Sequence, residues 1–146
     1  MEDLNARARG LALEMMTVAS RIRTAGEEVA LMFAFDFGGK DVRLVPAAEI
    51  PHSSKEQLTN TVRLIAAGSG AQIVLTAMEC WVGMNPMVAP SEDPARMEAI
   101  LVSASGSGVN ITMMRPIEGD GTLGEIIESE SAGGTFTNLS GREMMN

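Results

Sequence analysis

Cysteine and aromatic residues are the scarcest classes in this sequence, and their scarcity narrows what the chain can be. Among 146 residues there are one Cys, no Tyr and one Trp. A single Cys cannot form an intramolecular disulfide or supply a zinc site with four cysteine ligands. The sequence therefore favours a reducing compartment, and we expect a cytoplasmic protein.

Long apolar runs are also missing. No stretch approaches the ~20 apolar residues that a membrane-spanning helix requires, and the N-terminal MEDLNARARG carries acids where a secretory signal peptide carries bases. We expect neither secretion nor membrane insertion. The net charge of −8 argues against direct nucleic-acid binding, because Lys and Arg contacts to phosphates supply much of that affinity.

The residues that are present predict a folded protein. Hydrophobic residues make up 45% and charged residues 21% of the chain, which is typical of a globular domain. The length predicts a single domain over residues 1–146 with one core. Residues 116–146 are acidic and Gly-rich, and we interpret them as a C-terminal extension of the same domain.

An amphipathic helix is the clearest element. Its apolar stripe recurs at alternating spacings of four and three residues: Leu4, Ala8, Leu11, Met15, Val18 and Ile22. Asp3 is the expected N-cap and Gly26 the expected stop. A second apolar strip lies beside the first: Ala12, Met16 and Ala19. Two apolar neighbours are thus predicted, and we expect a homodimer whose interface includes Leu11, Met15 and Val18.

A β-hairpin is expected after the helix, over residues 29–46. Residues 29–37 alternate with period two, and Gly38-Gly39 is typical of a two-residue turn that sets Phe35 opposite Val42. The same turn sets Phe33 opposite Leu44. The second strand should end by Pro46.

The remaining elements are a helix and three further strands. Ser53 or Ser54 should cap the helix and Gly68 should end it. Strands are expected over residues 71–82, 96–104 and 109–115, an edge strand over 123–127, and a short segment over 136–139. The order α-β-β-α-β-β-β predicts an α+β fold: a mostly antiparallel sheet of five or six strands with two helices on one face. Profilin-like and roadblock-like domains have a similar element order.

One local pattern is distinctive. Glu79-Cys80-Trp81 is followed by a Pro-rich loop and then by the segment PSEDPARME over residues 90–98. The pattern E-x-W … P-S-x-x-P-x-R-x-E resembles a group of small uncharacterised bacterial and phage proteins, over residues 77–102, with a weaker echo over 134–139. The resemblance implies no particular activity.

Five residues of this region form the candidate binding site. Strand alternation puts Glu79 and Trp81 on one side, and a symmetric turn over residues 105–108 places Glu98 opposite Arg115. Arg96 shares the face of Glu98. A Trp flanked by an acid and a base can serve as a ligand platform. The alternative is structural: Trp81 caps the core while the charged residues fix the strand register.

Other reactive side chains have structural interpretations. Cys80 faces away from Trp81 among apolar residues, which predicts a buried, inert thiol. His52 is expected in a turn or helix cap, and Asp93 in a turn before Pro94. We predict no catalytic residues, no metal site and no cofactor.

Three functions remain open. The first is a small non-catalytic interaction or ligand-binding protein, a homodimer of phage or mobile-element origin that binds a protein partner or a small ligand. The second is a small enzyme that uses carboxylates such as Glu79, Glu98 or Asp93, with Arg96 binding an anion. The third is an acidic inhibitor that occupies a basic nucleic-acid site on another protein, as the charge of −8 would allow.

Overall fold

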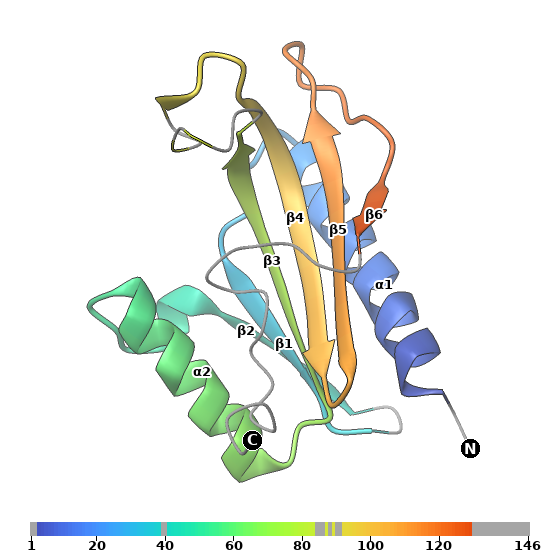
Figure 1. The fold of residues 1–146 in the computed structure, drawn as a ribbon, viewed down its shortest axis with the longest axis vertical. Coiled ribbons are helices and arrows are strands. Elements are labelled where there is room, and N and C mark those ends of the chain that lie inside the picture. The colour runs from blue at the N-terminus through green and yellow to red at the C-terminus, as the bar shows by residue number, and fades with distance from the viewer. Residues whose placement is uncertain (1–2, 39–40, 84–86, 88, 90–91, 130–146) are drawn as a thin grey trace.

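A computed structural model describes residues 3–38, 41–83, 87, 89 and 92–129. The elements follow in this order: α1 (Leu4–Thr24), β1 (Met32–Asp36), β2 (Val42–Pro46), η1 (Ala47–Glu49), α2 (Lys55–Ser69), β3 (Ile73–Val82), β4 (Met97–Gly106), β5 (Val109–Ile117) and β6 (Ile127–Ser129). The strands form one antiparallel sheet of six in the order β2-β1-β3-β4-β5-β6 (Figure 1). The predicted α+β class, with two α-helices and an antiparallel sheet, is confirmed.

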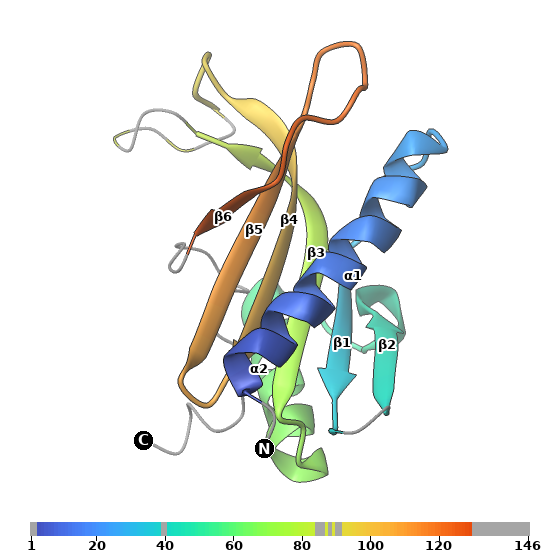
Figure 2. The same cartoon turned by 90° about the vertical axis from the view of Figure 1, so that its right-hand side faces the viewer.

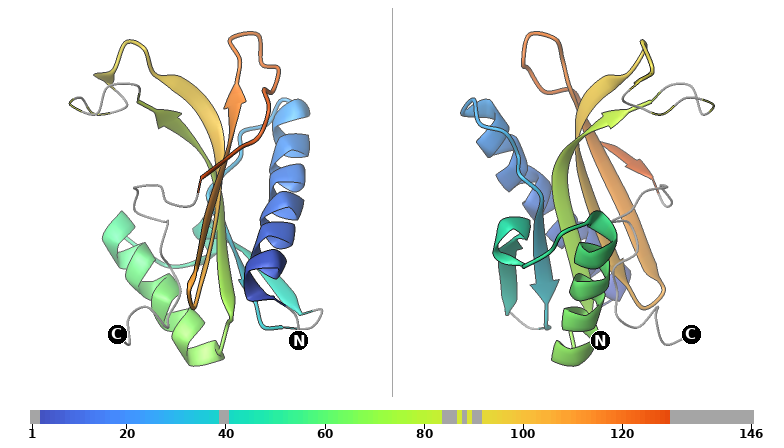
Figure 3. Two further views of the ribbon diagram at one scale, coloured as in Figure 1. Left: turned by 45° about the vertical axis from the view of Figure 1, so that its right-hand side comes forward. Right: turned by 90° about the vertical axis from the view of Figure 1, so that its left-hand side faces the viewer.

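The two α-helices cover opposite faces of the sheet (Figure 3), so the expectation that they share one face is wrong. The reason lies in β3, whose first five residues are all buried. Ile73 and Leu75 belong to the core beneath α1, whereas Val74 belongs to the core beneath α2. A strand that is apolar on both faces needs cover on both.

Helix α1 begins and ends as predicted, and both of its predicted apolar strips contribute to the core. Asp3 caps it by accepting a hydrogen bond from the Asn5 N–H at 3.0 Å, and Gly26 follows its last turn with a φ of 87°. The buried residues are the small strip and its neighbours: Ala8, Ala12, Met15, Met16, Ala19 and Ser20. Alanine lets a helix approach a sheet closely. The second strip is therefore fully buried, whereas Leu4, Leu11 and Ile22 of the first strip are partly buried against the same core and Val18 is exposed.

The β1–β2 hairpin forms, but its register differs by one residue from the prediction. The Phe37 N–H donates to the Asp41 carbonyl at 3.0 Å, so the turn is longer than Gly38-Gly39. Asp36 consequently pairs with Val42, and Leu44 pairs with Ala34. A shift of one residue changes the face of every side chain in the strand.

The β4–β5 hairpin differs by two residues. Gly106 pairs with Val109, which leaves Ser107 and Gly108 as the turn, and Gly108 has the positive φ of 70° that such a turn requires. Glu98 therefore lies opposite Ile117, and Arg115 lies opposite Ile100. The predicted cross-strand pair of Glu98 with Arg115 is wrong.

The helix and strand ends differ in smaller ways. Ser54 caps α2 by accepting from the Gln57 N–H at 3.0 Å, but the helix ends at Gly70 with a φ of 78°, not at Gly68. The edge strand β6 is shorter and later than expected, although Leu123 forms an isolated bridge with Ile117. The segment predicted over residues 136–139 lies outside the described residues.

Candidate functional site

The C-terminal half of α1 diverges from the end of the sheet (Figure 2). Between this half of the helix and the segment that follows β5 lies a cleft of about 800 Å³. Its polar lining comes from three places: Thr17, Ser20, Arg21 and Thr24 of α1, Arg115 of β5, and Asp120 and Thr122 of the following segment. We call this hollow the α1 cleft.

Arg115 lines the α1 cleft and connects the elements on either side of it. Its Nε donates to the Gly124 carbonyl at 2.8 Å, and its Nη1 donates to the Ser20 hydroxyl at 3.0 Å. One guanidinium thus ties β5 both to α1 and to the segment after β5. Its role is to join these elements, and not to pair with Glu98 as predicted.

Three of the predicted site residues meet at the adjoining end of the sheet. Trp81 lies opposite Glu98 in the β3–β4 ladder, and the Arg96 guanidinium carbon lies 4.5 Å from the indole centroid. The Trp81 side chain is 43% exposed. These three residues line a second hollow of about 360 Å³, which shares Gly121 with the α1 cleft.

Glu79 shares their face of the sheet but has structural bonds. Its carboxylate accepts a hydrogen bond from the Val29 N–H at 2.9 Å and lies 3.6 Å from the Arg23 Nε. The Glu79 N–H in turn donates to the Val29 carbonyl at 3.3 Å. Glu79 therefore fixes the connection between α1 and β1, and this geometry favours a structural role over ligand contact.

Asp120 is the acid of the α1 cleft. Hydrogen bonds from the Thr122 hydroxyl at 2.6 Å and the Thr122 N–H at 3.0 Å lower the pKa of its carboxyl. Asp120 thus stays ionised, but its charge is directed at Thr122. Within the part of the chain that the structure describes, no ion pair joins Asp120 to Arg21 or Arg115.

The other reactive side chains lie elsewhere. Cys80 is half-buried, not fully buried as predicted, and burial raises the pKa of its thiol. The His52 Nδ1 lies 2.6 Å from the Ile50 carbonyl, and Asp93 accepts from the Ala95 N–H at 2.9 Å, as in the predicted turns. Within the described residues, no three His, Cys, Asp or Glu side chains gather in a way that suits a metal ion.

The predicted interface residues border a different hollow. Leu11, Met15 and Val18 line an apolar groove of about 150 Å³ between α1 and β2, with Val42 and Leu44 on its far side. Met15 is buried in the core, Leu11 is half-buried and Val18 is exposed. Only the outer two can therefore meet another molecule without disturbing the fold.

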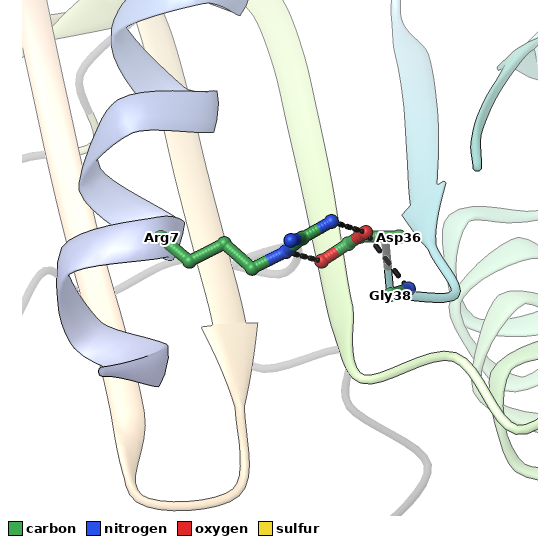
Figure 4. Close-up of polar contacts among 3 residues, drawn as sticks. All are labelled: Arg7, Asp36 and Gly38. Carbon is green, nitrogen blue, oxygen red and sulfur yellow. Dashed lines mark hydrogen bonds and ion pairs between the residues drawn. The ribbon is translucent and has the colours of Figure 1, made fainter. Parts of the chain in front are cut away.

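The sequence analysis missed a buried ion pair (Figure 4). Arg7 donates from Nε and Nη2 to the two carboxylate oxygens of Asp36, each at 2.6 Å, and the Gly38 N–H donates to the same carboxylate at 3.0 Å. The available signal was Asp36 itself, an acid in phase with Met32 and Ala34 on the face that packs against α1.

No family model, curated protein or solved structure matches this chain. Among the described residues, no helix combines the length and the apolarity needed to cross a membrane. The function must therefore be inferred from the site, because folds of this kind host many unrelated activities.

Proposed function

We propose that this chain is a non-catalytic ligand-binding protein, and that the α1 cleft binds a small anionic molecule. The observation that carries the proposal is the placement of Arg21 and Arg115 in a cleft of about 800 Å³, in a protein with a net charge of −8. The volume is within the range of ~300–1,000 Å³ that ligand sites occupy.

The hydrogen-bonding groups of the cleft define the ligand more closely. The Thr17 and Thr24 hydroxyls donate to helix carbonyls at 3.0 and 2.8 Å, so their oxygens are left to accept. The Ser20 hydroxyl accepts from Arg115 and keeps its own proton for donation. The cleft thus suits a molecule with an acidic group and hydroxyl or amino donors, such as a hydroxy acid or a sugar phosphate.

Arg21 supplies the available charge. It is exposed in the wall of the cleft, and no hydrogen bond or ion pair joins its guanidinium to another described residue. Arg115 is held in place by its two bonds and does not need to reorganise when the anion binds. Trp81 and Arg96 border the adjoining hollow and extend the surface that a larger ligand would meet.

Because the chain has a single Trp, which lines the hollow beside the α1 cleft, its fluorescence can report ligand binding. We expect native mass spectrometry of the purified protein to show a bound mass. We also expect inorganic phosphate, glucose 6-phosphate or citrate to shift the fluorescence of Trp81. Arg21→Ala should weaken binding by about 10- to 100-fold, the equivalent of one hydrogen bond to a charged group. Lys55→Ala removes a positive charge from α2, on the other face of the sheet, and should leave binding unchanged.

The refuting outcome is equally specific. If no mass is bound and none of these three anions changes the emission of Trp81 in the folded protein, the proposal is wrong. Equal losses of binding in Arg21→Ala and Lys55→Ala would also refute it, because they would reflect net charge and not the cleft.

The alternative functions have less support. An enzyme would need free carboxylates, but Glu79 and Asp93 bond to backbone N–H groups, which leaves Glu98 of the three candidates. An acidic inhibitor would need a dense anionic surface. The α1 cleft and the adjoining hollow are instead lined by both acids and arginines. A cytoplasmic location and a phage origin remain part of the proposal, on the basis of the single Cys and the resemblance over residues 77–102.

A further inference from the structure

We propose that β2 pairs with β2 of a second copy of this chain, antiparallel and centred on Leu44, so that the two sheets become one. The inference concerns the sheet edge and the apolar groove beside it. It is independent of ligand binding in the α1 cleft.

Within the described residues, no strand pairs with the outer backbone edge of β2. β2 is the terminal strand of the sheet (Figure 2). The Ala47 N–H donates to the Leu31 carbonyl and the Asp41 carbonyl accepts from the Phe37 N–H, both at 3.0 Å, so odd-numbered residues bond toward β1. The N–H and C=O groups of Val42 and Leu44 therefore point away from the sheet. An edge of this kind is a template for another strand.

The side chains of the same strand favour burial. Val42 and Leu44 lie on the same side of the sheet as α1, beyond the part that the helix covers, and are 41% and 54% exposed. They line the same apolar groove as Leu11 and Val18 of α1. Edge strands that stay unpaired usually carry charges. In β2 the exposed charge, Arg43, lies on the opposite face, and the positions beside the groove are the aliphatic Val42 and Leu44.

Charge selects the register of the pair. A dyad at Arg43 would place that residue opposite Arg43 of the second copy, and like charges directly opposite each other are destabilising. A dyad at Leu44 places Arg43 opposite Val45 instead. The two Leu44 side chains then meet at the axis, and each Val42 faces a Pro46.

The hydrogen bonds fit this register and a second copy of the same strand. Each Leu44 N–H donates to the Leu44 carbonyl of the other copy, and each Val42 N–H donates to a Pro46 carbonyl. Pro46 has no N–H to offer, so the only group left without a partner at these positions is the Val42 carbonyl. Every outward N–H of Val42 and Leu44 is satisfied by groups that the same strand supplies.

Light scattering on the full chain tests the association. We expect twice the chain mass at tens of micromolar protein. Leu44→Lys places two positive charges at the axis and should weaken the dimer at least 10-fold. Leu64→Lys is the matched control, because Leu64 is an exposed leucine on α2, which covers the face of the sheet opposite to Val42 and Leu44. Circular dichroism shows whether each variant folds.

Disulfide trapping tests the register, in a Cys80→Ala background. In the proposed pair the two Leu44 Cα atoms lie about 5.5 Å apart, within the ~4.4–6.8 Å that a disulfide spans. The two Arg43 Cα atoms are diagonal neighbours at about 7–8 Å, beyond that range. Leu44→Cys should therefore form a covalent dimer on mild oxidation, and Arg43→Cys should not.

Each result decides the proposal. A monomeric wild-type protein, a dimer that survives Leu44→Lys, or trapping through Arg43→Cys and not Leu44→Cys would overturn it. A dimer that Leu44→Lys dissociates, that Leu64→Lys leaves intact, and that Leu44→Cys traps would establish it. None of these outcomes depends on whether the α1 cleft binds an anion.

Discussion

The buried ion pair between Arg7 and Asp36 yields the sharpest stability prediction. The Asp36 side chain is 0% exposed and that of Arg7 is 14% exposed. Arg7→Met keeps much of the side-chain volume but leaves the carboxylate buried without its cation. Breaking such a pair from one side costs about 3–5 kcal/mol. For a domain of this length we expect a fall in Tm of about 10–20 °C, at roughly 4 °C per kcal/mol.

A matched control lies two residues further along the same helix. Arg9 pairs with Glu128 at 2.9 Å, but the two side chains are 50% and 37% exposed. Solvent screens this pair, and Arg9→Met should cost at most about 1 kcal/mol. Both variants lose one arginine from α1, so the difference between them isolates burial from the loss of charge.

The double variant Arg7→Met with Asp36→Leu completes the test. Replacing both partners by apolar residues removes the buried charge together with its counter-charge, so the double variant should lose much less stability than the sum of the two single variants. The free energy of unfolding is measured by urea titration, monitored by circular dichroism. A loss below about 1 kcal/mol for Arg7→Met, or additive losses in the double variant, would refute the reasoning.

Three further predictions concern other parts of the fold. In Gly106→Ala the new Cβ would lie 2.7 Å from the Gln72 carbonyl oxygen, so thermal unfolding should show a loss of about 1–3 kcal/mol. The Cys80 thiol, whose pKa burial raises, should react with iodoacetamide more slowly than free cysteine at pH 8 and match it in urea. Thr122→Val should raise the pKa of Asp120 in an NMR titration; its lowered pKa stabilises the fold above pH 3.8, and this contribution is lost as the pH falls.

The side chains that share a face of a strand could be predicted, because the alternation of side chains with period two depends only on the local sequence. Alternation alone put Glu79 and Trp81 on one side, and the ladder places Glu98 beside Trp81 on that side. The β4–β5 register was wrong by two residues, an even number, so Arg115 stayed on the correct face although its partner changed. Alternation therefore predicts which residues share a surface, but it does not predict which of them touch.

The α1 cleft could not be predicted in the same way. It depends on the tilt of α1 away from the sheet and on the return of the chain after β5, which brings Gly124 within 2.8 Å of the Arg115 Nε. The sequence did not indicate that Ser20 lines a site, because a serine among alanines is common on a helix. Contacts between residues 95 positions apart, such as Arg115 with Ser20, follow from packing and not from a local pattern.

The errors in the β1–β2 and β4–β5 registers have different consequences for the edge of the sheet. A shift of two residues leaves faces unchanged, whereas the shift of one in the β1–β2 hairpin moves Val42 and Leu44 away from the phenylalanine face and toward α1. With the predicted register these aliphatic side chains would pack beside Phe33 and Phe35 in the core under α2. With the observed register they lie at the open end of the groove beside α1, where the helix does not cover them. The longer turn therefore exposes the apolar side chains of this edge, and this exposure is the observation from which we infer that β2 pairs with a second copy.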